Sequence, residues 1–195
     1  TDWQPCDAAL IQLGSYAGLI LTSANAVEAF FERMNIKGLD LRALAGVEII
    51  AVGPKTAKAI EKRGLKPDFV PNDYRAEGVV DELLKRGVSG KRYLYPRTEI
   101  ARSLISDSLT KSGAQVDAPI VYRTLAPEGK QEMIRHLLDA NELDAICFSS
   151  SSTFDNLHAM FGDELQQLKK ETAFFSIGPL TSATIRKHKF DVALE

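Results

Sequence analysis

The chain has 195 residues, a length that one domain or two small domains can fill. It is 45% hydrophobic and 26% charged, with 8 prolines and 13 glycines, a composition that excludes disordered and collagen-like classes. The 24 basic and 26 acidic residues leave a net charge of −2, so no overall positive field attracts nucleic acid or an anionic membrane. We therefore expect neither partner, and any anion site must be local.

The two cysteines, Cys6 and Cys147, form no C-x-x-C motif, which argues against a cysteine-based zinc site. Cys147 lies in an apolar run, where we expect it to be buried. No apolar stretch is long enough to span a membrane and no signal peptide opens the chain, so we expect a soluble, cytoplasmic protein. The chain starts at Thr1 rather than Met and ends directly after a strand-like segment at 190–194, so we expect both ends to be cut.

After a lead-in at residues 1–13, short apolar runs alternate with helical patterns from 14 to 113, which is typical of βα units around a parallel sheet. The first helical pattern, at about 25–34, places its large apolar residues on one helix face. The expected strands are 19–21, 47–52, 69–71 and 92–95, and the expected helices are about 25–34, 54–63, 76–86 and 101–109. We interpret residues 14–113 as a complete α/β lobe.

Residues 114–126 form an extended stretch with Pro119, and the helix-breaking segment 126–129 follows it. We interpret this stretch as an inter-lobe linker strand. The α/β pattern then restarts over 127–195, with strands expected at 145–148 and 174–177 and helices at about 130–140, 153–168 and 179–188. The predicted fold is α/β, with two similar parallel-sheet, flavodoxin-like lobes joined by an extended β linker, the second lobe incomplete in this chain.

Two separate motifs repeat at nearly the same spacing, which supports two lobes of common design. Residues 21–27 align with 148–154, and residues 52–57 align with 177–182. Each motif runs from a strand into a helix through serine or through Gly-Pro. In a parallel sheet such junctions lie at the carboxyl edge, where free helix amides attract anions.

The candidate anion-binding hydroxyls at these four junctions are Ser23, Thr56, Ser150 and Thr181. The alternative is that they only cap helices, a role that suits the same residue types. Four junctions, two from each lobe, favour a ligand with many negative groups.

Arg97 follows a predicted strand, so its guanidinium should project from the same edge, where its fork of donors suits a carboxylate. The alternative is a solvated surface arginine. Lys55, Arg102 and Arg186 are weaker candidates of the same kind. Tyr122 lies in the linker strand, where it either packs against a sheet or faces a cleft.

Motifs for dinucleotides, P-loop phosphates, a serine nucleophile elbow and H-E-x-x-H zinc sites do not occur in the sequence. The histidines, His136, His158 and His188, lack ligand spacing, and we expect all three to be solvated on polar helix faces. If the protein is an enzyme, we therefore expect it to use no metal and no cofactor.

Six motifs, in this order and spacing, resemble the uroporphyrinogen-III synthase family. They are LTSANAV at 21–27, AVGPKTA at 51–57, LYPR at 94–97, VYRT at 121–124, FSSS at 148–151 and IGPLT at 177–181. The resemblance implies two α/β lobes linked by a two-stranded ladder that the chain crosses twice, an active site in the cleft, and no metal or cofactor. It also implies that a first strand and helix and a final helix of the family are missing here, both from the second lobe.

The implied reaction closes hydroxymethylbilane, a linear tetrapyrrole with eight carboxylates, into uroporphyrinogen III with inversion of the last ring, ring D. The product leads to heme, siroheme and cobalamin. Carried over by position, Tyr122 helps the substrate hydroxyl leave. The substrate-binding residues would be Ser23, Ala24, Thr56, Arg97, Ser150, Ser151 and Thr181.

The resemblance also suggests fusion or association with a tetrapyrrole methyltransferase or with hydroxymethylbilane synthase. We expect this fragment to have little activity of its own, because one lobe lacks elements. The alternative function is a two-lobe module that binds an anion or small molecule and does no chemistry.

Overall fold

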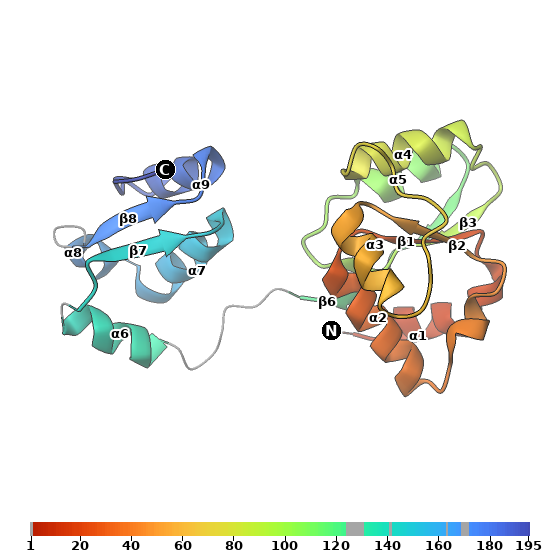
Figure 1. Cartoon of the computed structure of the whole chain (residues 1–195), viewed down its shortest axis with the longest axis horizontal. Coiled ribbons are helices and arrows are strands. Elements are labelled where there is room, and N and C mark those ends of the chain that lie inside the picture. Colours follow the sequence, from red (N-terminus) through yellow and green to blue (C-terminus); the bar gives the residue numbers. More distant parts are fainter. Residues whose placement is uncertain (1, 124–130, 141, 163, 169–171) are drawn as a thin grey trace. The chain divides into compact units, whose positions relative to one another are not determined.

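The computed structural model describes residues 2–123, 131–140, 142–162, 164–168 and 172–195. The chain divides into two compact units, unit 1 at Thr1–Thr124 and unit 2 at Leu125–Glu195 (Figure 1). Unit 1 is built around a four-stranded sheet whose strands are all parallel, in the order β2-β1-β3-β5. The mixed α/β class with parallel sheets is therefore confirmed.

The sheet strands of unit 1 come close to the expected ranges at three of four places. They are β1 Gly18–Leu21, β2 Glu48–Ala51, β3 Arg92–Leu94 and β5 Gln115–Asp117. The expected strand at 69–71 is wrong, because only an isolated bridge joins Phe69 to Ile50 there. All four residues of β1 are buried, as expected for a strand covered on both faces.

The helices of unit 1 follow the expected pattern, with one addition. They are α1 Gln4–Ile11, α2 Ala24–Ile36, α3 Pro54–Glu61, α4 Ala76–Lys85 and α5 Leu104–Lys111, with short 3-10 turns at Leu13–Ser15 and Leu41–Leu44. The segment 1–13, expected only as a lead-in, contains α1, whose Cys6, Ala9 and Leu10 are buried. Pro54 opens α3, and Gly87, at φ 75°, follows the end of α4.

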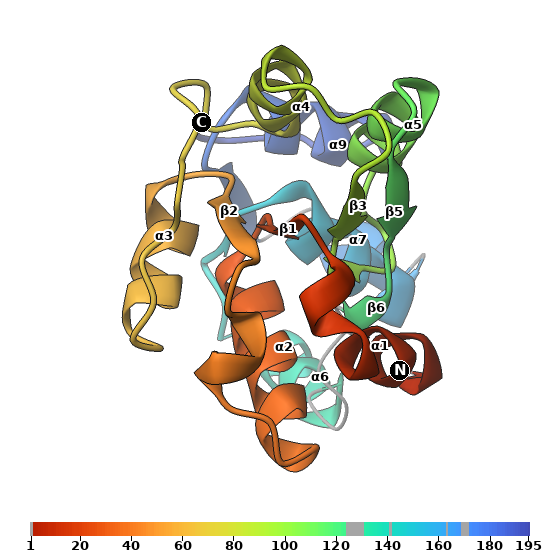
Figure 2. The same cartoon turned by 90° about the vertical axis from the view of Figure 1, so that its right-hand side faces the viewer.

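Helices cover both faces of the unit 1 sheet (Figure 1). Leu19 and Leu21 of β1 pack with α1, α2 and α3 on one face, and Ile20 packs with α4 and α5 on the other. Figure 2 shows the strands side by side, with α4 and α5 along one face and α1 and α2 along the other. This three-layer arrangement holds the carboxyl ends of β1, β2 and β3 at a common edge.

The expected linker strand pairs within unit 1 as far as the structure describes it. After β5, strand β6 Ile120–Tyr122 pairs in parallel with β4 Arg97–Thr98. The Arg97 backbone N–H donates to the Pro119 carbonyl over 2.9 Å. The segment 126–129, where we expect the chain to leave this unit, lies outside the described residues.

Unit 2 has a two-stranded parallel sheet of β7 Ala145–Phe148 and β8 Ala173–Ser176. Its helices in the described ranges are α6 Gln131–Asp139, α7 Ser151–Phe161, α8 Glu164–Leu168 and α9 Pro179–Lys187. The expected single helix at 153–168 is wrong, because the chain turns at Gly162, whose φ is 52°. The strand-like segment 190–194 contributes only a bridge between Leu194 and Phe175.

The core of unit 2 is aromatic. Phe148, Phe154, Phe174 and Phe190 are buried together, with ring centroids of neighbouring pairs 5.2 to 5.5 Å apart. Cys147 alternates with Phe148 along β7 and is exposed, so its expected burial is wrong. The apolar run indicated the strand but not which of its faces is covered.

Candidate active site

Ser23 and Tyr122 meet at the carboxyl edge of unit 1. Ser23 caps α2, and its Oγ accepts a hydrogen bond from the Ala26 backbone N–H over 3.1 Å. The same Oγ lies 3.0 Å from the Tyr122 hydroxyl oxygen. Tyr122 comes from β6 and packs its ring, partly buried, against the core on the α2 side. The structure thus brings together two residues that the sequence placed in separate motifs.

The hydrogen-bonding capacity of these two hydroxyls decides what the pair can do. Ser23 Oγ already accepts from an amide, and its own proton remains to be donated. When Ser23 donates to Tyr122, the tyrosine proton is free for a third group. The chain from amide to serine to tyrosine then stabilises negative charge on the tyrosine oxygen as that proton leaves.

Tyr95, which the sequence analysis did not select, lies at the same edge. It follows β3 directly and is 4% exposed. Burial raises the pKa of the Tyr95 hydroxyl, while a hydrogen bond with Thr22 and the positive charge of Arg97 lower it. The nearby Tyr122 raises the pKa of Tyr95 further. Tyr95 stands inside the LYPR motif, but its position at a strand end made core packing the default interpretation.

Arg97 has unused donor capacity. One terminal nitrogen donates to the Ala101 carbonyl over 2.8 Å, but its Nε is buried without a hydrogen-bond partner. Arg102 pairs with Glu77, and Arg123 pairs with Glu99. Arg97 has no carboxylate partner among the residues that the structure describes. Because Arg97 is partly exposed, an incoming carboxylate would meet its terminal nitrogens, of which only one has an acceptor in the described part of the chain.

A cavity of about 380 Å³ lies where β1 and β2 run into α2 and α3. It is lined by the predicted residues Ser23, Ala24 and Thr56, together with Lys55 and Tyr74. Both helices begin here, so their unpaired N–H groups face a potential anion. Tyr74, another residue missed from the sequence, is 61% exposed. A side chain at Gly53 would place its Cβ 3.2 Å from that of Tyr74, so the glycine leaves room for this ring.

At the carboxyl edge of the unit 2 sheet, serine and threonine again stand at the helix starts, and here several hydroxyls are hydrogen-bonded in a network. Ser150 caps α7 in a capping box with Thr153. Ser151 Oγ donates to the Leu180 carbonyl over 3.2 Å and accepts from Thr184 Oγ1 over 2.9 Å, which joins α7 to α9. Thr181 is the third residue of α9, as Thr56 is of α3, and each is 4% exposed. Buried threonines suit a packing role, which leaves the helix amides as the main donors.

The model of a family described as uroporphyrinogen-III synthase HemD matches residues 1–195. The chain belongs to the uroporphyrinogen-III synthase family. The resemblance seen in the sequence is therefore confirmed.

Two relatives of this chain are named uroporphyrinogen-III synthase. The uroporphyrinogen-III synthase of Synechococcus elongatus is 31% identical over 192 residues, which cover 96% of this chain and 72% of the relative. That of Chlorobaculum parvum is 25% identical, with 90% of this chain and 71% of the relative covered.

Solved structures of uroporphyrinogen-III synthases share the fold. A structure from Helicobacter pylori has a TM-score of 0.62 at 19% identity and covers 93% of this chain and 77% of that one. A mutant from Thermus thermophilus has a TM-score of 0.60 at 20% identity and covers 100% and 77%. At such identities these likenesses establish the fold alone, and the two-lobe description is consistent with them.

The weaker cationic candidates Lys55, Arg102 and Arg186 differ in whether a carboxylate of the protein already pairs with them. Arg102 is paired with Glu77 at 2.9 Å, and Arg186 lies 3.9 Å from Glu195. Lys55 is exposed and has no ion pair in the described part of the chain. Of the three, only Lys55 therefore adds a free charge to the candidate site of this family member.

Two of the three histidines pair with each other instead of standing solvated. The rings of His158 and His188 lie 4.2 Å apart between centroids, and His188 Nε2 is 3.7 Å from Asp155 Oδ1. Both rings contact Phe154 at the rim of the unit 2 core. Nothing in the separate helix patterns indicated this approach. In the ranges described, no group of three or more His, Cys, Asp or Glu side chains is placed to hold a metal ion.

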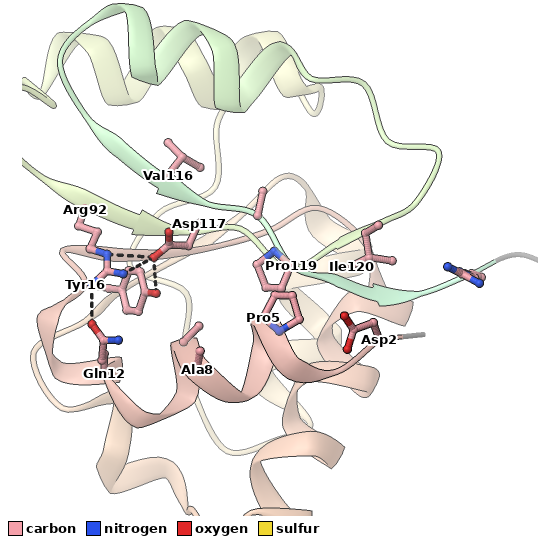
Figure 3. A pocket seen from close by; sticks show the side chains of 13 residues that line it. Asp2, Pro5, Ala8, Gln12, Tyr16, Arg92, Val116, Asp117, Pro119 and Ile120 are labelled. Atoms are coloured by element: carbon pink, nitrogen blue, oxygen red, sulfur yellow. Dashed lines mark hydrogen bonds and ion pairs between the residues drawn. The ribbon is translucent and has the colours of Figure 1, made fainter.

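A further cavity, of about 510 Å³, contains none of the predicted site residues (Figure 3). It lies between α1 and the β5–β6 segment. Asp117 accepts hydrogen bonds there from the Tyr16 hydroxyl at 2.5 Å and from Arg92 Nε at 2.9 Å, and Arg92 also donates to Gln12. Burial and the bond to Asp117 raise the pKa of Tyr16. These groups use their hydrogen-bonding capacity on one another, so we interpret the network as one that stabilises the packing of α1 against the sheet.

One further absence concerns membranes. None of the helices in the described ranges combines the length and the apolar character that crossing a bilayer requires.

Proposed function

We propose that this family member closes hydroxymethylbilane into uroporphyrinogen III with inversion of ring D, as a lyase of tetrapyrrole biosynthesis. The observation that carries the proposal is the contact of 3.0 Å between Ser23 and Tyr122 on β6, whose paired strand β4 carries Arg97, an arginine with no carboxylate partner among the described residues. A hydroxyl with a proton to give, next to an unpaired cation, suits a substrate that loses a hydroxyl group and carries carboxylates.

In the proposed first step, Tyr122 donates its proton to the hydroxymethyl oxygen of the bilane. The carbon–oxygen bond breaks, water leaves, and the electrons of the pyrrole nitrogen form an azafulvene. Ser23 donates to the tyrosine oxygen, which spreads the negative charge that develops there. The substituted α-carbon of ring D then attacks the azafulvene carbon and forms a spiro intermediate. The older bond from this carbon to its methylene bridge breaks, and the bridge carbon bonds to the free α-carbon of ring D, which inverts the ring. Loss of a proton at the end restores the aromatic pyrrole and can return the proton to Tyr122.

The carboxylates of the substrate would bind at the helix starts. In unit 1 the amides of α2 and α3, next to Ser23, Ala24 and Thr56, offer donors, and Arg97 offers a charge. In unit 2 the corresponding residues are Ser150, Ser151 and Thr181. Local donors of this kind explain how a protein of net charge −2 can hold eight carboxylates.

Positioning carries much of the catalysis in this proposal. A linear bilane also closes spontaneously without inversion, so the protein must make that closure slower than the inverting one. Holding the reacting ends in a near-attack geometry gives the selectivity that one proton donor alone does not.

We further propose that the first lobe, expected at 14–113, also includes α1 and β5, that the linker expected at 114–126 begins after β5, and that residues 127–195 are part of a second lobe. Fusion or association with a tetrapyrrole methyltransferase or hydroxymethylbilane synthase also remains a proposal. It draws support from the porphyrin biosynthesis protein HemD of Ruminiclostridium josui, of which the match covers only 29%. Copurification of the native protein with either enzyme would test it.

The decisive experiment incubates the purified full-length protein with hydroxymethylbilane and identifies the isomer formed. The proposal expects uroporphyrinogen III, with unchanged turnover after treatment with a chelator. Formation of the type I isomer at the uncatalysed rate would contradict it. Tight binding with release of unchanged bilane would instead support the binding-module alternative.

A further inference from the structure

The outer face of α3 carries a row of cations. Lys55, Lys58 and Lys62 follow one another at intervals of three and four residues, which places them on one face of the helix, and Arg63 comes next. All four residues are exposed. Together with Ala24 and Glu28 of α2 they line a cavity of about 400 Å³ between the two helices. We call these four residues the basic track.

The basic track gathers four cations without an ion pair among the described residues on one helix and the two residues after it, whereas several arginines of unit 1 are neutralised. Arg33, Arg75 and Arg86 each pair with a carboxylate at 2.6 to 2.7 Å. In the described ranges, none of the four cations of the basic track forms an ion pair. The one carboxylate that lines their cavity, Glu28, leaves an excess of positive charge. Since the whole protein is slightly acidic, this excess is a local feature.

The basic track leads to the candidate active site. Lys55 and Ala24 line both the cavity of the basic track and the cavity at Ser23 and Thr56. A ligand that first contacts Lys58 is therefore about one helix turn from the amino end of α3, and one that contacts Lys62 is about two turns away.

We propose that the basic track steers the polycarboxylate tetrapyrrole toward the candidate active site and raises its rate of association. This inference rests on the proposed function for its ligand. Charged rims of a binding site act mainly on the encounter rate, because the ligand remains solvated while it is attracted. A substrate with eight carboxylates experiences such a field more strongly than one with four.

The test measures association of uroporphyrin, a stable octacarboxylate, by stopped-flow fluorescence. The variant is Lys58→Gln with Lys62→Gln. The matched control is Lys91→Gln with Lys111→Gln, two exposed lysines of unit 1 that lie on other elements and have no ion pair in the described part. Measurements at about 0.01 M and about 0.15 M salt change the Debye length from about 30 Å to about 8 Å.

We expect the variant to lower the association rate about 3- to 10-fold at low salt, to change dissociation less than about twofold, and to flatten the salt dependence. The control should behave as wild type, and coproporphyrin, with four carboxylates, should show a weaker salt effect. Equal rates for variant and control, or no uroporphyrin binding to wild type, would overturn the inference. A protein that binds uroporphyrin in this way but does not convert hydroxymethylbilane would refute the proposed function and leave the steering intact.

Discussion

The hydroxyl oxygens of Ser23 and Tyr122 lie 3.0 Å apart, although the two residues are 99 positions apart in the chain. The contact depends on two local features. The turn from β1 into α2 fixes Ser23 as a helix cap, and pairing of β6 with β4 fixes Tyr122. Because each side chain is already held in place, the pair loses little further freedom when substrate binds.

The first prediction removes the proposed proton donor. Tyr122→Phe should lower kcat for hydroxymethylbilane by at least about 100-fold, as loss of a general acid does. The melting temperature should stay close to that of wild type. Tyr16→Phe is the matched control, because it removes a hydroxyl from the network at Asp117, outside the candidate site. A decrease of kcat within about tenfold, which loss of a neutral hydrogen bond explains, would show that Tyr122 only positions the ring.

The second prediction concerns coupling between the two hydroxyls. Ser23→Ala should lower the free energy of unfolding by about 1 kcal/mol, because α2 loses its cap. It should also lower kcat, since the tyrosine oxygen loses its donor. In a Tyr122→Phe background the same change should lower kcat little further, as for residues that act as a unit. Fully additive effects on kcat in the double variant would contradict the hydroxyl chain.

The sequence predicted most of unit 1 because its signals are local. Periodicity, Pro54 at a helix start and glycines at helix ends each determine structure within a few residues. The helix α1 was missed because its pattern is weak and its burial depends on distant partners. Tyr95 and Tyr74 were missed for a related reason. Whether a tyrosine at a strand end or in a loop lines a cavity depends on what packs over it, and Gly53 gave no sign that it makes room for Tyr74.

The same limit applies in unit 2. The repeat predicted that Thr56 and Thr181 occupy equivalent positions, and the structure places both third in their helices. The approach of His158 to His188 joins α7 to the end of α9, and no motif spans that distance in sequence. The exposure of Cys147 likewise follows from which face of a two-stranded sheet is covered. The sequence thus predicted most helices and strands, but not the contacts between them.

The third prediction tests a close approach at the start of α4. A Cβ at Gly78 would clash with the carbonyl oxygen of Asp73. Gly78→Ala should therefore destabilise the protein by about 1–3 kcal/mol in urea unfolding, despite the higher helix propensity of alanine. Gly14→Ala is the control, since a Cβ there meets no atom within 4 Å. Equal stability of the two variants would contradict the geometry of this turn.

The fourth prediction distinguishes the two thiols. Burial raises the pKa of Cys6 to about 11, whereas Cys147 is exposed. A thiol reagent at neutral pH should therefore modify Cys147 of the native protein rapidly, and Cys6 only after unfolding. Mass spectrometry of the labelled peptides identifies the residue. Rapid modification of Cys6 in the native state would show that α1 is not packed as described.

The last prediction concerns acid stability at the contact between α1 and α2. The hydrogen bonds from Arg33 lower the pKa of Asp7 from its ordinary value of 3.8 to about 2, against the effect of burial, and Lys37 lies 2.7 Å away. A carboxyl whose pKa is lower in the folded state contributes stability that is present above pH 3.8 and is lost as the pH falls through the folded value. Asp7→Asn should therefore melt at a lower temperature than wild type near pH 6. The gap should narrow between about pH 4 and about pH 2, because wild type loses the same interaction there.

Asp81→Asn, at an exposed carboxylate with no ion pair among the described residues, should show no such convergence. A gap that stayed constant down to pH 2 would mean that Asp7 stabilises the fold without its charge, and the ion pair with Arg33 would then not be what holds α1 against α2.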